Sequence, residues 1–146
     1  MKVHIISMKI YIASSWKNQH AVEMMTDLLE NKGHTVFSFV RASTDVDEAV
    51  RNGETDSFDD WIAGPDGRAK FDYDLTSATG ANLVIYIGPS GTDAWAEVGA
   101  AWARGVPVLG LWAKGEPAGL MRRMVTWFSD YKKLLTQVDI AAAGWH

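Results

Sequence analysis

Short apolar runs alternate with amphipathic segments along most of the chain, and this alternation predicts strands followed by helices. The runs are rich in β-branched and aromatic residues and are bounded by polar or glycine-containing turns, which is typical of buried parallel strands. We expect strands at residues 9–13, 35–40, 83–87, 106–112 and 125–128. The pattern therefore predicts an α/β protein whose strands pair in parallel.

The segments between these runs have the apolar spacing of helices that bury one face. Helices are expected at residues 18–32, at 68–79, from a cap at Thr92 or Asp93 to about residue 104, and at 130–142. Gly33 and Gly105 follow two of them, where a left-handed residue commonly ends a helix. The expected fold is a doubly wound parallel sheet of about five strands, Rossmann- or flavodoxin-like. We expect residues 9–146 to form this single domain and residues 1–8 to be an N-terminal extension.

Residues 41–67 are the least regular part of the chain. Short helices are expected at 45–52 and 56–63, and the sequence Gly64-Pro-Asp-Gly67 predicts a turn. The segment is rich in acidic residues, which is typical of a solvated face. A mobile lid over a binding site is the alternative, and the sequence leaves both open.

Composition and charge exclude several classes of function. The chain has 146 residues, a net charge of −4 and no basic run, so we expect no duplex nucleic acid as a partner. It has no cysteine, and its four histidines are scattered, so we expect no metal and no cofactor. No apolar stretch approaches the roughly 20 residues that span a bilayer, and the first residues lack the pattern of a signal peptide. We therefore expect a cytoplasmic protein without a membrane partner.

Candidate chemistry gathers in residues 88–105, directly after the apolar run at 83–87. A strand, a glycine-bearing turn and a helix form the part of an α/β fold where ligands usually bind. Ser90, Gly91 and Thr92 place hydroxyl and N–H groups near the expected helix N-terminus. Such groups suit an anion, for example a phosphate, or form only an ordinary capped turn.

Two carboxylates stand out beside this turn. Glu97, near the start of the helix, either interacts only with the helix dipole or is a reactive group. Asp74 lies next to the expected buried stripe of Phe71, Leu75 and Ala78, so it is able to pair with Glu97. Glycosidic cleavage needs one carboxylate that attacks C1′ and one acid that protonates the leaving group. The helix N-terminus would keep Glu97 ionised for the first role, and burial would raise the pKa of Asp74 for the second.

Five short motifs follow one another along the chain. They are Lys9-Ile-Tyr-Ile-Ala-Ser-Ser-Trp16, Phe71-Asp-Tyr-Asp-Leu75, Asn82-Leu-Val-Ile-Tyr-Ile87, Glu97-Val-Gly-Ala-Ala101 and Glu116-Pro-Ala-Gly-Leu-Met121. In this order they resemble the first strand, central helix, following strand, catalytic helix and late loop of the nucleoside 2-deoxyribosyltransferases. The form Pro89-Ser-Gly…Glu97-x-Gly is similar to that of small members carried by phages and bacteria.

The resemblance implies a role for each matching residue. Glu97 matches the nucleophile that forms a glycosyl-enzyme intermediate, and Tyr11 matches the tyrosine that positions it. Asp74 matches an aspartate implicated in proton transfer at the base, and Trp16 matches an aromatic residue of the base pocket. Asp93 stands near the family's sugar-hydroxyl aspartate. The alternative roles are core packing for Tyr11 and Trp16, a surface helix acid for Asp74, and a helix cap for Asp93.

The resemblance also implies groups that bind the rest of a nucleoside or nucleotide. In the related deoxynucleoside 5′-monophosphate N-glycosidases, serines in these turns hold the phosphate, and Ser14, Ser15 and Ser90 are available here. The substrate-binding candidates also include the neighbours of Ser90 and the last residue of the late loop. These are Gly91, Thr92 and Met121.

Departures from the family favour hydrolysis over base transfer. The transferases carry an asparagine from a neighbouring subunit where this chain has Gly119, and their C-terminal tail is not recognisable here. Asn82 replaces the aspartate that usually ends the central helix region. We therefore expect hydrolysis of an N-glycosidic bond through an intermediate on Glu97. The alternatives are a non-catalytic nucleotide-binding or sensing module and a related NAD- or nucleotide-hydrolysing Rossmann-like enzyme.

Small residues on the expected catalytic helix bear on assembly. Gly99, Ala100 and Ala103 allow another helix to approach closely. Because the family completes its sites across subunits, the resemblance implies a homodimer or a larger homo-oligomer.

Overall fold

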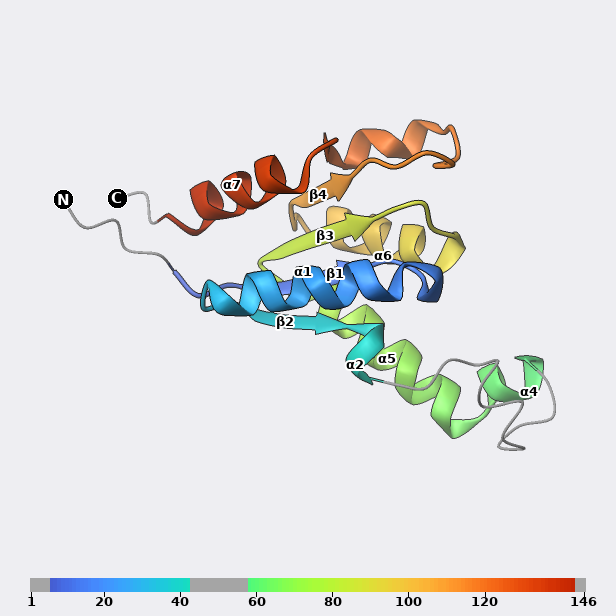
Figure 1. Ribbon diagram of the computed structural model, residues 1–146. Helices are drawn as coiled ribbons and strands as arrows, with labels where there is room; N and C mark the ends of the chain where they lie inside the picture. The colour runs from blue at the N-terminus through green and yellow to red at the C-terminus, as the bar shows by residue number, and fades with distance from the viewer. Residues whose placement is uncertain (1–5, 43–57, 144–146) are drawn as a thin grey trace.

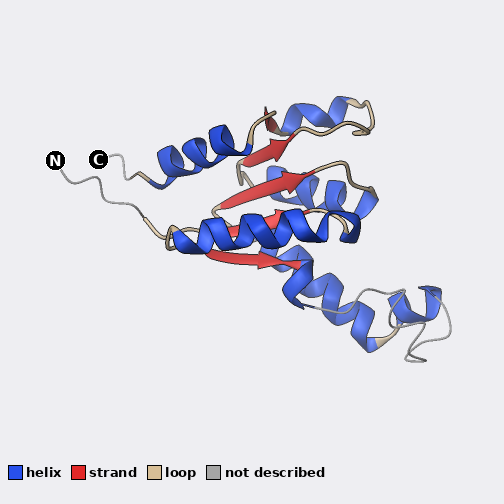
Figure 2. Cartoon of the chain, in the orientation of Figure 1, coloured by secondary structure: helices blue, strands red, loops and turns tan. Residues whose placement is uncertain are grey.

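Five strands form one parallel sheet in the computed structural model, which describes residues 6–42 and 58–143 (Figures 1 and 2). The strands are β1 (Lys9–Ala13), β2 (Thr35–Ser38), β3 (Leu83–Ile87), β4 (Val108–Leu111) and β5 (Thr126–Phe128). Their order is β2-β1-β3-β4-β5, and all four neighbouring pairs are parallel. The predicted doubly wound α/β fold is confirmed, and its order is the flavodoxin-like one.

Helices cover both faces of this sheet. The long helices are α1 (Gln19–Asn31), α5 (Pro65–Thr79), α6 (Thr92–Ala103) and α7 (Tyr131–Ala142). One core joins α1 and α7 to the face of β1 that carries Ile10 and Ile12, and the other joins α5 and α6 to the face that carries Tyr11 and Ala13. The short described elements are η1 (Trp16–Asn18), α2 (Phe39–Ala42), α4 (Phe58–Ala63) and η2 (Leu120–Met124).

The strand order places two loops side by side. β1 and β3 are direct neighbours, with Ala13 opposite Tyr86, although a helix, a strand and further helices separate them in sequence. The chain turns one way from β1 to β2 and the other way from β3 to β4, so the crossovers diverge at this point. In doubly wound sheets ligands bind outside the carboxyl ends of the strands at such a switch point.

Helix ends explain most differences from the sequence-based boundaries. The predicted turn at 64–67 is wrong, because α5 already begins at Pro65, whose fixed φ suits the first helical position. Gly67 lies inside the helix, and its missing Cβ makes room for the backbone of Trp61 in α4. The predicted helix 45–52 lies outside the described residues.

The ends of the other elements differ less. The strand predicted to reach residue 40 ends at Ser38, and Phe39 begins α2. Gly33 and Gly105 have φ of 93° and 81°, so both predicted left-handed helix ends are confirmed. Of the predicted buried stripe on α5, Ala78 is buried, but Phe71 is 62% exposed.

The residues before β1 are attached to the domain. The Ile6 N–H donates to the Ala142 carbonyl at 2.8 Å, and Met8 is buried in the core of α1 and α7. None of the helices in the described residues is both long and apolar enough to cross a membrane.

Candidate active site

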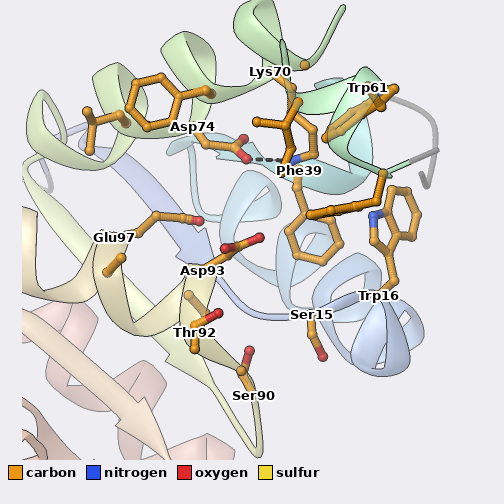
Figure 3. Close-up of a pocket in the computed structure, with 18 of the residues that line it drawn as sticks. Ser15, Trp16, Phe39, Trp61, Lys70, Asp74, Ser90, Thr92, Asp93 and Glu97 are labelled. Carbon is orange, nitrogen blue, oxygen red and sulfur yellow. Dashed lines mark hydrogen bonds and ion pairs between the residues drawn. The ribbon is translucent and has the colours of Figure 1, made fainter. Parts of the chain in front are cut away.

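A cavity of about 920 Å³ opens beside the carboxyl ends of β1 and β3 (Figure 3). The turn after β1, the first half of α6, and helices α4 and α5 supply most of its walls. The polar and charged lining residues are Ser14, Ser15, Arg68, Lys70, Asp74, Ser90, Thr92, Asp93 and Glu97. The aromatic ones are Trp16, Phe39, Phe58, Trp61 and Phe71. The loops at the switch point therefore enclose a site that is polar on one side and aromatic on the other.

Glu97 is fixed at the floor of this cavity by a residue of the central sheet. Its side chain is 9% exposed. The Tyr11 hydroxyl lies 2.9 Å from Oε1 and 2.8 Å from Oε2, within donating distance of both. Burial and the nearby Glu97 raise the pKa of Tyr11, so its hydroxyl stays protonated and remains a donor. The hydroxyl of Tyr11 therefore orients the Glu97 carboxyl.

The pKa of Glu97 is raised to about 8, mainly by burial and then by the neighbouring charge of Asp74. The hydrogen bond from Tyr11 and the charge of Lys70 act in the opposite direction. The expectation that the helix N-terminus keeps this group ionised is therefore wrong for the free chain. α6 begins at Thr92, so Glu97 lies beyond its first turn, where the dipole is weak and burial dominates.

Asp74 approaches the same cavity from α5 (Figure 3). Burial raises its pKa, and the hydrogen bond and charge of Lys70 oppose the rise. Lys70 Nζ lies 2.5 Å from Asp74 Oδ2, whereas Oδ1 is buried without a hydrogen-bond partner. Two carboxyl groups and one lysine thus share a poorly solvated space.

The serines of the two turns differ in what their hydroxyls do. Ser14 Oγ donates to the Ile87 carbonyl at 2.7 Å and accepts from Asn18 Nδ2 at 3.2 Å, so it fastens the turn after β1 to β3. Ser15 Oγ and Ser90 Oγ are buried and have no partner. Buried hydroxyls are rarely left unpaired, so both lack a hydrogen-bond partner that their burial calls for.

The N-terminus of α6 adds backbone donors to this corner. Its N-cap residue is Gly91, and no side chain caps it. Of the two roles left open for Asp93, the helix cap is therefore wrong; this side chain is exposed and lines the cavity. The uncapped first turn presents N–H groups and a partial positive charge beside Ser90 and Thr92.

Aromatic side chains form the opposite wall. Trp16 packs edge-on against Phe39, with ring centroids 5.0 Å apart, and Phe58 stacks on Trp61 at 6.2 Å. Trp16 was identified from the sequence, whereas Phe39 and Trp61 were not. α4, which belongs to the segment expected to be either a solvated face or a lid, lines the cavity. Residues 43–57 of that segment lie outside the described residues.

Met121 lies outside the cavity that the other candidates share. It is 62% exposed on η2 and is not among the lining residues. The other ten of the eleven candidate residues are at the cavity: nine line it, and Tyr11 contacts one of these, Glu97. Within the described residues, no group of three or more histidine or acidic side chains is arranged to hold a metal ion.

Nothing in the sequence indicated that a second carboxylate, that of Glu116, is buried. Glu116, in the loop after β4, is 7% exposed. The Tyr86 hydroxyl contacts its two oxygens at 2.6 and 2.7 Å, and Trp95 Nε1 donates at 3.0 Å. Glu116 does not line the cavity. A glutamate in an irregular loop gives no periodic signal, and only the folded chain shows its partners.

Two solved structures are similar in fold to this chain. The chain is similar to a 2-deoxyribosyltransferase of Bacillus psychrosaccharolyticus, with a TM-score of 0.63 and 21% identity over 94% of this chain and 98% of that one. It is also similar to the CMP N-glycosidase BcmB of Clostridium botulinum, with a TM-score of 0.51 and 18% identity over 89% of this chain and 97% of that one. No family model and no curated protein matches the sequence. The chain therefore has the fold of a nucleoside 2-deoxyribosyltransferase and of a nucleotide N-glycosidase, as the motifs implied.

Proposed function

We propose that the chain cleaves the N-glycosidic bond of a nucleoside 5′-monophosphate or nucleoside, with Glu97 as nucleophile and Asp74 as acid. The observation that carries this proposal is the buried Glu97 carboxyl, held by Tyr11 in the cavity that Asp74 also lines. The two solved structures of similar fold act on this kind of bond by their names, which supports the same class of substrate.

The reaction begins from the form of the pair that holds one proton, on Asp74. Ionised Glu97 attacks C1′, the C1′–N bond breaks, and its electrons leave with the base. The base takes the proton from Asp74, and a sugar ester of Glu97 remains. Asp74, now ionised, takes a proton from water as that water attacks C1′. Glu97 is released as the carboxylate, and two inversions give retention of configuration at C1′.

Tyr11 acts as a positioning residue in both steps. Its phenol donates to the carboxylate form of Glu97, and a hydrogen bond to the charged form favours ionisation. It also fixes the orientation of the carboxylate, because its hydroxyl lies within hydrogen-bonding distance of both oxygens.

The polar corner supports a phosphate on the substrate. Ser15 and Ser90 offer unpartnered hydroxyls, and the uncapped N-terminus of α6 offers backbone donors. The wall of Trp16, Phe39 and Trp61 offers flat apolar surface for a base. A nucleoside 5′-monophosphate matches both ends of the cavity, so we infer that it is a better substrate than the nucleoside.

Hydrolysis is favoured over transfer because water is a small acceptor. Base exchange needs an intermediate that is shielded from water. Gly119 stands where the transferases place a subunit-crossing asparagine, and the adjacent Leu120 and Met121 are 80% and 62% exposed. An added free base should therefore not be incorporated faster than the sugar is hydrolysed.

Exposed apolar residues support association of the chain with itself. Trp102 on α6 is 56% exposed, and Leu120 and Met121 on η2, which packs against α6, are also exposed. We infer a homodimer in which these residues are covered. Light scattering at micromolar concentration measures the mass directly, and a stable monomer would contradict this inference.

The experiment that tests the function is a release assay on paired substrates. Each base is offered as ribo- and deoxynucleoside and as the corresponding 5′-monophosphate, together with NAD, and free base is quantified by chromatography. Wild type is expected to release base from at least one monophosphate, and Glu97→Ala is expected to release none. No release from any substrate, or equal release by Glu97→Ala, contradicts the proposal.

The second candidate function is a nucleotide-binding module without turnover. The pKa of Glu97 near 8 favours it, because a protonated carboxyl does not attack C1′. Tight binding without product, unchanged in Glu97→Gln, would support this candidate over the enzyme.

A further inference from the structure

Helix α5 places Lys70 one turn before Asp74, in the wall of the cavity. Their side chains are 17% and 15% exposed, and the Nζ–Oδ2 distance is 2.5 Å. Lys32 and Asp139 form a comparable pair on the surface, at 3.1 Å and with 34% and 43% exposure. Exposed pairs contribute little, whereas burial of a lysine is costly unless a partner compensates it. The position of Lys70 inside the wall therefore calls for a specific role.

The charges around Lys70 are mostly negative. Asp74 lies on its own helix, Glu97 and Asp93 face it from α6, and Tyr11 faces the pair from β1 as a neutral phenol. From α5, Tyr73 adds a further phenol near Tyr11, and Arg68 adds an exposed cation at the rim. The Lys70 ammonium also lies 5.7 Å from the Phe39 ring centroid. Within residues 6–42 and 58–143, Lys70 is thus the cation that contacts Asp74 directly, and its charge also acts on Glu97.

We propose that Lys70 is the positioning residue of the acid: it holds Asp74 through Oδ2, leaves Oδ1 to carry the proton, and limits the two buried carboxyls to one shared proton. This rests on the proposed function, because it assigns Lys70 a part in that same reaction. The motifs in the sequence give no role to this lysine.

The unequal contacts of the Asp74 oxygens support this role. Oδ2 accepts from Lys70, and Oδ1 is buried, unpartnered and part of a side chain that lines the cavity. A carboxylic acid carries one proton on one oxygen, and an oxygen already facing an ammonium group is the worse place for it. Whenever Asp74 holds the shared proton, that proton therefore lies on Oδ1.

The number of protons in the pair is the second part of the role. With no proton, two buried carboxylates repel each other; with two protons, there is no nucleophile. A positive charge beside the pair favours the form with one proton and one negative charge. Both carboxyls titrate as a coupled unit, so Lys70 acts on the pair and not on Asp74 alone.

Removal of the positive charge should shift the titration of both carboxyls to higher pH. The charge of Lys70 lowers the pKa of Asp74 and of Glu97 in the intact chain. An opposite charge at this range shifts a carboxyl by about 1–3 pH units. In Lys70→Met the acidic limb of kcat/KM therefore moves up by at least about one unit. Below that limb each unit is a tenfold loss of rate, so at pH 6 the variant is expected to be at least about 10-fold slower.

The experiment compares three variants with wild type. Lys70→Met removes the charge and keeps an unbranched apolar chain, Lys70→Arg keeps the charge, and Lys32→Met removes the exposed ion pair as a matched control. Carboxyl ¹³C shifts of the substrate-free proteins are titrated first, and kcat and KM on the best monophosphate are then measured from pH 5 to 10. Lys70→Gln is a second neutral variant should the methionine variant misfold.

In the expected result, Lys70→Met raises the titration midpoint of Glu97 and shifts the kcat/KM profile to higher pH, with KM changed less than threefold. Lys70→Arg keeps the wild-type profile within about half a unit, and Lys32→Met is unchanged. Unmoved midpoints, a lower rate with an unshifted profile, or a rise in KM alone would each overturn the proposal. The carboxyl titration needs no turnover, so it tests the role of Lys70 independently of activity. The proposed function fails separately, if wild type releases no base.

Discussion

Among the described residues, two glutamates are buried on the side of the sheet that Tyr11 and Tyr86 face, and each is held by one of these tyrosines. Tyr11 on β1 donates to both oxygens of Glu97, and Tyr86 on β3 donates to both oxygens of Glu116. The two arrangements differ in what lies on the other side of the carboxyl group.

Glu116 is enclosed by aromatic side chains. Trp95 donates to it, and the rings of Tyr86, Trp95 and Trp127 pack against one another at centroid distances of 4.9 to 6.2 Å. Arg122 donates to its backbone carbonyl at 2.5 Å and stacks over Trp112. This glutamate ties the loop after β4 to β3 and α6.

Glu97 instead faces the cavity, where Asp74, Lys70 and Asp93 influence its charge. In the part of the chain that the structure describes, the phenol of Tyr11 is the one hydrogen-bond donor to the oxygens of Glu97. The comparison teaches that burial and a tyrosine donor do not by themselves make a reactive carboxylate. Access to a ligand and a second titrating group distinguish the two.

The largest expected effect separates the two glutamates by activity. Glu97→Gln keeps the shape of the side chain and removes the nucleophile, so kcat should fall by about 10³-fold or more. Glu116→Gln should leave kcat within about fivefold but lower the free energy of unfolding by about 1–3 kcal/mol, because buried partners lose an ionic acceptor. Steady-state kinetics and urea unfolding measure both. A larger loss of kcat in Glu116→Gln would remove the distinction.

Substitution of the two tyrosines should show the same difference between activity and stability, with a smaller effect on kcat. Tyr11→Phe removes the donor to Glu97, and loss of one such hydrogen bond is expected to reduce kcat by about 10²-fold. Since that bond lowers the pKa of Glu97, the acidic limb of the rate profile should also move to higher pH. Tyr86→Phe serves as the matched control and should change stability, not the profile. Equal pH profiles for the two variants would contradict the account.

The pH dependence of stability should also report on Glu97. Its pKa is raised from 4.5 in the reference state to about 8 in the folded chain, so folding favours the protonated form. The stabilisation is complete below pH 4.5 and is lost as pH rises through about 8. Glu97→Gln cannot ionise, so it should gain about 4 kcal/mol relative to wild type between pH 5 and pH 9. Urea unfolding of both proteins across this range measures the difference, and parallel curves would show that Glu97 is not so perturbed.

The smallest expected effect distinguishes the serines. Ser15→Ala and Ser90→Ala should each raise KM for a 5′-monophosphate by about tenfold, the equivalent of one charge-assisted hydrogen bond, and leave KM for the nucleoside unchanged. Ser14→Ala should reduce stability instead, because its hydroxyl bonds the Ile87 carbonyl. Equal effects on nucleotide and nucleoside would show that these hydroxyls do not meet a phosphate.

The sequence predicted the parts of this account that depend on local pattern. The strands at 9–13 and 83–87 agree with β1 and β3 to the residue, because apolar runs between polar turns have one simple interpretation. Gly64-Pro-Asp-Gly67 fits both a turn and a helix start, and only the packing of α4 on α5 decides between them.

The same distinction holds for the site: local motifs identified some of its residues, and properties that depend on the assembled fold were not predicted. Tyr11, Asp74 and Glu97 were found through short motifs, whereas Lys70 was missed because a lysine four residues before an aspartate usually marks a solvated helix face. Its burial depends on α6 and α2, which are distant in sequence. The pKa of Glu97 was predicted in the wrong direction for the same reason, since burial is a property of the assembled fold.

Trapping of the intermediate tests the central claim most directly. A 2′-deoxy-2′-fluoro nucleoside 5′-monophosphate slows formation and breakdown of an oxocarbenium-like state, so a glycosyl-enzyme should persist long enough for peptide mass spectrometry. The account predicts one glycosyl group per chain, on the peptide that contains Glu97, and none in Glu97→Gln. Release of base without any adduct, or an adduct on Asp74 or Glu116, would contradict it.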